Sequence, residues 1–132
     1  MMISGVTIPS PADYLYTQTH EWMKKEGDIL TIGITRFAVD ELSDVTFVDL
    51  PAIGRKVAAG GTFGEIESVK ATSELYAPVE GEIIAVNDEL KKDPSLMNED
   101  PYTKGWLVKL KTSVEPHGFM TAQQYDKVHN IA

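Results

Sequence analysis

The stretch from residue 64 to residue 81 reads Gly64-Glu-Ile-Glu-Ser-Val-Lys70-Ala-Thr-Ser-Glu-Leu-Tyr-Ala-Pro-Val-Glu-Gly81 and is the most informative part of the chain. Two strand-like segments, 65–69 and 73–77, are separated only by residues 70–72, a spacing typical of a β-hairpin. Lys70 is therefore predicted to lie at the bend. A side chain at such a tip is accessible, and the scaffold below it fixes its position.

A lysine at this bend suits covalent attachment of a carrier group. Its side chain is a flexible stem that ends in an amine able to form an amide. Amide formation removes the positive charge and would leave a neutral arm between the carboxylates of Glu67 and Glu74. The same residues also fit a solvated, charge-balanced turn, so the lysine by itself does not decide between the two interpretations.

Short strand-like segments surround the hairpin. Apolar and polar residues alternate at 30–34 and 106–110, and segments 45–50 and 82–86 are also typical of strands. Helical turns are predicted at 36–42, with Phe37, Ala38 and Leu42 facing inward, and at 87–92, whereas 93–104 is predicted to be a long loop. Short strands at this spacing indicate an antiparallel β-sandwich or a small barrel.

A helix over residues 121–130 is expected to close the chain. Thr121 and Gln124 have the spacing of a capping box, and Met120 and Tyr125 stand where a hydrophobic staple places its two apolar partners. We expect one domain over residues 1–132, in which 1–13 form an N-terminal extension of no assigned role and 64–81 form the hairpin.

The composition narrows the classes of partner. A net charge of −8 argues against nucleic acid or a membrane surface as partner, since both need clustered Lys and Arg. The absence of cysteine excludes disulfides and thiolate metal sites, and the three histidines lack metal-ligand spacing, so no metal is expected. We find no apolar run of the roughly 18 residues that span a membrane, and no signal or transit peptide.

Four blocks of the sequence together resemble the H-protein family of the glycine cleavage system. Residues 67–83 are similar to its lipoylation hairpin, and residues 16–22, 32–51 and 98–106 are similar to three further blocks. The resemblance runs in order from about residue 14 to residue 130. Ser43 stands where this family usually has glycine, a residue that would serve a turn with positive φ.

The resemblance implies a mainly β fold, the lipoyl-domain-like barrel-sandwich hybrid of antiparallel sheets with short helices and a C-terminal helix. It implies lipoate covalently attached to Lys70. The flanking Val69 and Ala71 favour lipoate over biotin, whose carriers place methionines beside the lysine. The implied recognition hairpin comprises Glu67, Ser68, Val69, Ala71 and Gly81, the last lying eleven residues after the lysine.

The activity implied is that of a carrier and not of an enzyme. It shuttles the aminomethyl group of glycine from a pyridoxal-phosphate glycine decarboxylase (P protein) to a tetrahydrofolate-dependent aminomethyltransferase (T protein). A dihydrolipoyl dehydrogenase (L protein) reoxidises the arm, and a lipoate ligase or octanoyltransferase attaches it. The expected location is a bacterial cytoplasm, or the mitochondrial matrix for a processed eukaryotic protein.

A carrier of this cargo needs a sheltered cleft, because water would release the carried group as formaldehyde. The cargo ends in an amine that is protonated near neutral pH, so we expect a carboxylate at the cleft. The resemblance points to Glu21 for this role, with Glu74 and Glu41 as further candidates and His20 beside them. Trp22 is expected to be a core or cleft-wall aromatic.

Three other functions stay open at this point. The same hairpin would serve a donor that passes lipoate to the carrier domains of other proteins, and the sequence does not separate this role from the carrier role. A biotin carrier is disfavoured by the residues beside Lys70. An independent enzyme is disfavoured because the sequence shows neither a paired catalytic constellation nor a phosphate-cradling glycine loop.

Overall fold

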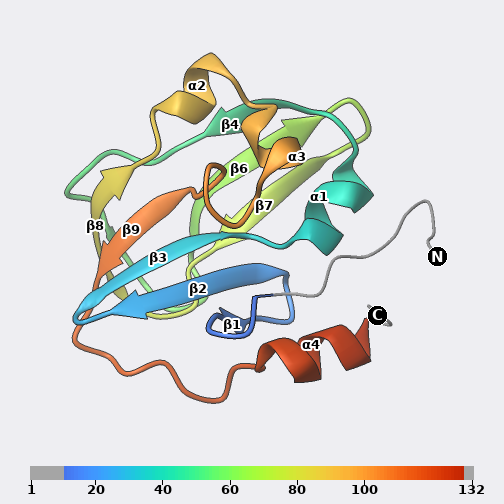
Figure 1. Ribbon diagram of the computed structural model, residues 1–132. Coiled ribbons are helices and arrows are strands. Elements are labelled where there is room, and N and C mark those ends of the chain that lie inside the picture. The colour runs from blue at the N-terminus through green and yellow to red at the C-terminus, as the bar shows by residue number, and fades with distance from the viewer. Residues whose placement is uncertain (1–10, 130–132) are drawn as a thin grey trace.

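The computed structural model describes residues 11–129, which form two antiparallel β-sheets and four short helices (Figure 1). The larger sheet contains, in spatial order, β1 (Leu15–Tyr16), β2 (Glu21–Glu26), β3 (Ile29–Ile34), β9 (Val108–Lys111), β8 (Gly81–Val86) and β5 (Lys56–Val57). The smaller sheet contains β4 (Val45–Asp49), β6 (Thr62–Ser68) and β7 (Thr72–Tyr76). The helices are α1 (Arg36–Leu42), α2 (Glu89–Lys92), α3 (Leu96–Glu99) and α4 (Ala122–Val128). This confirms the predicted mainly β class.

The hydrophobic core lies between the two sheets. Alternation along β3 turns Leu30 and Ile32 inward, and both are fully buried. Ile66 of β6 joins them from the smaller sheet, with Ile83 of β8 and Leu110 of β9 from the larger one. Each such side chain contributes about 1.5–3 kcal/mol on burial. The β6–β7 hairpin therefore stands on a rigid base.

Gly81 is required by the close approach of two strands. It begins β8 and pairs with β5, while β9 runs along the other side. A Cβ at this position would lie 2.5 Å from the carbonyl oxygen of Lys111 and 2.8 Å from the side chain of Leu110. Packing between the strands therefore requires a glycine at this position, independently of any role of Lys70.

One local prediction was wrong, and a second was incomplete. Segment 93–104, predicted to be a loop, contains α3, whose Asn98 side chain donates to the carbonyl of Ser43 and accepts from the N–H of Val45. These bonds to a distant part of the chain order the segment. In α1, Phe37, Ala38 and Leu42 pack against the core as predicted, but Val39, which was not predicted, is buried more deeply than Phe37 and Ala38. Val39 and Leu42 are three residues apart and therefore lie on the same face of the helix.

The C-terminal helix has the predicted cap. The Thr121 side chain accepts from the backbone N–H of Gln124, and the Gln124 side chain accepts from the backbone N–H of Thr121. Met120 and Tyr125 belong to the same apolar cluster, as a hydrophobic staple requires. No helix among the described residues is long and apolar enough to cross a membrane.

Ser43, which follows α1, adopts φ 67° and ψ −141°, a backbone region that is close to one populated almost only by glycine. The positive φ expected at this position is therefore present, although the residue is serine. We expect Ser43→Gly to raise the free energy of unfolding by about 1 kcal/mol, because it relieves this strain. Urea denaturation measures the change. Ser43→Ala retains the Cβ and should bring no gain, and equal stabilities of the two variants would contradict the strain argument.

Candidate functional site

The turn between β6 and β7 is built by the side chain of Ser68. Its Oγ accepts from the backbone N–H groups of Lys70 (3.2 Å) and Ala71 (2.9 Å) and donates to the Ala71 carbonyl. The Ser68 N–H also donates to the Ala71 carbonyl at 2.8 Å. Beside it, the N–H of Val69 donates to the Asp44 carbonyl at 3.1 Å, which ties the turn to the segment before β4. The backbone of the tip is thus held without help from the lysine side chain.

The Lys70 side chain is exposed and its amine is accessible. Nζ donates to the backbone carbonyl of Glu41, in the last turn of α1, at 3.2 Å. Because this acceptor is neutral and the contact lies in solvent, it contributes little and gives way readily to another bond. The geometry therefore presents a primary amine at a rigid tip, next to the end of α1.

A cleft of about 340 Å³ opens beside Lys70. Its walls come from the loop before β2, from α1 with the end of β3, and from the start of β7. The lining residues are Thr19, His20, Glu21, Ile34, Phe37, Ala38, Glu41, Leu42, Lys70, Ser73 and Glu74. The structure thus brings the four candidate cleft residues and the lysine together in one place.

Glu21 is the buried carboxylate of this cleft, with 1% of its surface exposed. Its Oε1 accepts from the hydroxyls of Thr17 (2.6 Å) and Thr19, and its Oε2 accepts from the backbone N–H of Tyr76 at 3.2 Å. Burial raises the pKa of the Glu21 carboxyl above its ordinary value, against the opposing effect of these hydrogen bonds. The side chain therefore links the loop before β2 to strand β7.

The other two carboxylates of the cleft are exposed. Glu41 lies on α1, and Glu74 lies on β7, where its Oε2 accepts from the hydroxyl of Tyr76 at 3.1 Å. Together with Glu21 they give the cleft three acidic groups against one lysine cation. Acylation of Lys70 would remove that cation and leave a negative potential suited to a positively charged guest.

His20 lines the cleft and also contacts the C-terminal helix. It has a positive φ of 73°, and its Nδ1 lies 2.7 Å from the hydroxyl of Tyr125 on α4. Burial, and then the neighbouring His129, lower the pKa of His20 below its ordinary value. A neutral imidazole therefore stands in the wall of the cleft near neutral pH.

The remaining residues of the predicted recognition hairpin lie outside the cleft. Glu67 is exposed on β6 opposite Thr72, Val69 and Ala71 are exposed at the tip, and Gly81 lies in the larger sheet. Their part in recognition by a modifying enzyme stays a prediction. Thr17 and Thr19, which hold Glu21, were not predicted as site residues, although the alternation Thr-x-Thr-x-Glu at 17–21 is a local signal for them.

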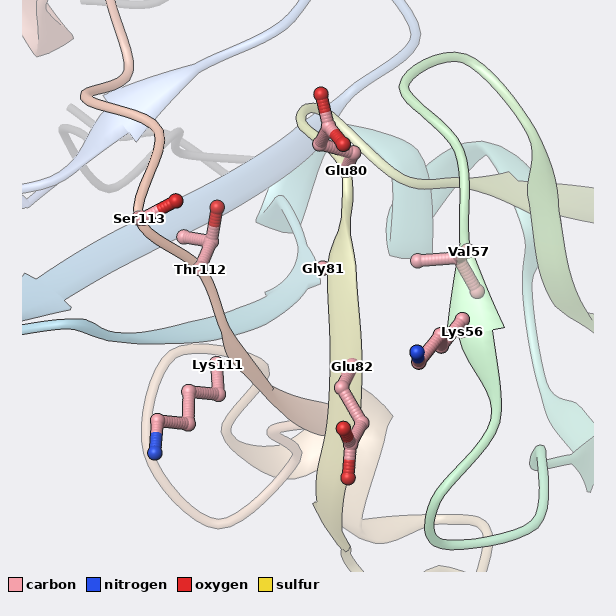
Figure 2. A pocket seen from close by; sticks show the side chains of 8 residues that line it. All are labelled: Lys56, Val57, Glu80, Gly81, Glu82, Lys111, Thr112 and Ser113. Carbon is pink, nitrogen blue, oxygen red and sulfur yellow. The ribbon is translucent and has the colours of Figure 1, made fainter.

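A second hollow, at the edge of the larger sheet, has a different character (Figure 2). Lys56, Glu82 and Lys111 stand opposite one another on β5, β8 and β9, and all three are exposed. Such opposite charges on neighbouring strands stabilise a sheet modestly. Within residues 11–129 there is also no cluster of three or more His, Asp or Glu residues able to hold a metal ion. The cleft beside Lys70 is thus the candidate site.

Comparisons with known proteins show the family of the chain. A family model described as glycine cleavage H-protein matches residues 14–131. The chain is 54% identical over 118 residues to a glycine cleavage system H protein of Nitratidesulfovibrio vulgaris strain Miyazaki F, covering 89% of this chain and 93% of that protein. It is 55% identical over 106 residues to one of Rubrobacter xylanophilus, covering 80% and 84%.

A solved structure supports the fold. The crystal structure of a glycine cleavage system H protein from Mycobacterium marinum superposes with a TM-score of 0.85 at 38% identity, covering 92% of this chain and 99% of that one. The two facing sheets of the present structure are therefore the barrel-sandwich hybrid that the resemblance implied.

Proposed function

Because the chain belongs to the glycine cleavage H-protein family, we propose that Lys70 carries a covalently attached lipoyl group and that the protein is the lipoyl carrier of the glycine cleavage system. The observation that carries the proposal is the position of the lysine. An exposed amine stands at a rigid hairpin tip, directly beside a cleft that contains three carboxylates. The protein would shuttle the aminomethyl group of glycine and would not itself catalyse a reaction.

The residues of the cleft fit a lipoyl arm. Ile34, Phe37 and Leu42 give the cleft an apolar wall, which suits the aliphatic chain and the dithiolane ring of the group. Within the described part of the chain the lysine amine bonds only to a neutral carbonyl, so acylation breaks no ion pair there. When attached, the lipoyl group supplies the dithiolane chemistry that takes up the aminomethyl group and delivers it.

The chain itself would supply shelter and charge. The apolar wall keeps bulk water away from a hydrolysable cargo. Glu41 and Glu74 are exposed carboxylates and can pair with a cationic amine, whereas both oxygens of Glu21 already accept hydrogen bonds. Glu21 would therefore act through its buried negative charge and by holding Thr19 in the wall.

The partners follow from membership of this system. They would be the glycine decarboxylase, the aminomethyltransferase, the dihydrolipoyl dehydrogenase, and a lipoate ligase or octanoyltransferase that modifies Lys70. The net charge of −8 favours docking onto basic patches of these proteins. A cytoplasmic location belongs to the same proposal.

Intact-mass analysis of the protein purified from its native host tests the proposal. We expect a mass increase equal to one lipoyl group, and peptide mapping should locate it on Lys70. A streptavidin blot should be negative, since the attached group is not biotin. An unmodified Lys70 in cells that contain lipoate and its ligase would contradict the carrier mechanism.

A further inference from the structure

A chain of hydrogen bonds connects the start of α1 to the cleft through the C-terminal helix. The hydroxyl of Tyr125, on α4, lies 2.8 Å from Oγ1 of Thr35 and 2.7 Å from Nδ1 of His20. Thr35 and Tyr125 are fully buried, whereas His20 is partly exposed and lines the cleft. His20, which lines the cleft beside Lys70, is thus hydrogen-bonded to α4, and no residue of α4 lines that cleft.

The direction of these hydrogen bonds follows from counting protons. Burial raises the pKa of Tyr125, so its hydroxyl keeps its one proton. Oγ1 of Thr35 already accepts from the Ala38 N–H as the N-cap of α1, and its own proton needs an acceptor inside the protein. Both requirements are met when Thr35 donates to Tyr125 and Tyr125 donates to Nδ1 of His20. The proton of a neutral His20 then lies on Nε2.

The surroundings of His20 keep the ring neutral and fixed. The ring packs against Phe37 (5.1 Å between centroids) and His129 (4.8 Å), with Tyr125 edge-on at 5.9 Å. Burial and then His129 oppose a positive charge on the ring, and the weaker attraction of Glu41 favours one. His20 also has a positive φ of 73°, an uncommon conformation that persists because these surrounding contacts hold it.

We propose that Tyr125 is a positioning residue that holds His20 as a neutral, Nε2-protonated imidazole in the wall of the cleft beside Lys70. The C-terminal helix is then a functional part of this cleft. The consequence is electrostatic. A cationic imidazole would compete with a cationic amine for the cleft carboxylates, whereas a neutral ring offers a single N–H donor and leaves the carboxylates free. This consequence rests on the proposed lipoyl function, but the tautomer and its control by Tyr125 do not.

The direct test is the protonation state of His20 in the 132-residue chain with an unmodified Lys70. The ¹⁵N chemical shifts of the imidazole, followed by NMR across pH, report both the tautomer and the pKa. We expect the Nε2–H tautomer and a pKa below the ordinary value. In Tyr125→Phe, which keeps the ring but loses the hydroxyl, we expect a mixture of tautomers and a higher His20 pKa, because Nδ1 has lost its donor.

Tyr16→Phe is the matched control. Tyr16 stacks on Tyr125 with ring centroids 5.0 Å apart, but its hydroxyl donates to the Pro11 carbonyl. Loss of the Tyr16 hydroxyl should leave the ¹⁵N spectrum of His20 unchanged. An Nδ1–H tautomer in the unsubstituted protein, or the same His20 spectrum in Tyr125→Phe, would overturn the inference.

A second measurement tests the consequence for the arm. With lipoylated proteins loaded by the decarboxylase, Tyr125→Phe should release its cargo to water severalfold faster than Tyr16→Phe near pH 6, and the difference should shrink toward pH 8. Equal rates at both pH values would overturn the role of the helix in the cleft. If Lys70 takes up no lipoate, the proposed function fails, while the NMR result still decides the tautomer.

Discussion

Lys70→Arg is expected to leave a folded protein that carries no lipoyl group and supports no glycine decarboxylation. The substitution keeps the positive charge but replaces a primary amine with a guanidinium, which does not form the amide. The turn is held by Ser68 and by backbone bonds, and the lysine side chain adds only one solvent-exposed bond to the Glu41 carbonyl. The free energy of unfolding should therefore change by less than about 0.5 kcal/mol. Intact mass after co-expression with a lipoate ligase measures the modification.

The matched control for this prediction is Lys56→Arg. Lys56 is exposed on β5 and lines the hollow shown in Figure 2, not the cleft beside Lys70. This variant should be lipoylated and should support glycine decarboxylation in the reconstituted system as well as the unsubstituted protein does. Glycine decarboxylation by Lys70→Arg at the level of this control would contradict the assignment of the arm.

The hairpin could be predicted because its signals are local. Two β-rich segments and a three-residue bend fall within one short stretch, and the structure places Lys70 in the turn between β6 and β7. Strand β2 could not be found in this way. Its sequence Glu-Trp-Met-Lys-Lys-Glu has no clean alternation, and its extended form is set by pairing along the whole of β3.

In the cleft, too, contacts between residues close together in the sequence could be predicted, whereas contacts between distant residues could not. Family resemblance pointed to Glu21, with His20 beside it, but each of these residues also makes a hydrogen bond to a partner far along the chain. The bond between Tyr125 and His20 joins residues 105 positions apart, and the bond from the Tyr76 N–H to Glu21 spans 55 positions. Tertiary pairing decides such contacts. Trp22, by contrast, was expected as a core or wall aromatic, and it is 1% exposed with its indole N–H donating to the Pro101 carbonyl.

Glu21→Ala is expected to lower the free energy of unfolding by about 3 kcal/mol. The substitution leaves the hydroxyl of Thr17 and the N–H of Tyr76 without their acceptor, and it takes from Thr19 the shorter of its two bonds. An unsatisfied buried donor costs about 1–3 kcal/mol, and the loss of the carboxylate's own desolvation cost offsets part of the sum. Urea denaturation measures the difference. Glu26→Ala, at the exposed end of the same strand, should change stability by less than about 0.5 kcal/mol.

The pH dependence of this effect has a definite sign. The pKa of Glu21 is raised in the folded protein, so between the ordinary glutamate value of about 4.3 and that raised pKa the folded state binds more protons than the unfolded state. Stability contributed by Glu21 is therefore present at lower pH and is lost as the pH rises through this window. The stability gap between the unsubstituted protein and Glu21→Ala should accordingly narrow with rising pH. A gap that widens instead would mean that the three donors stabilise the carboxylate more than burial destabilises it.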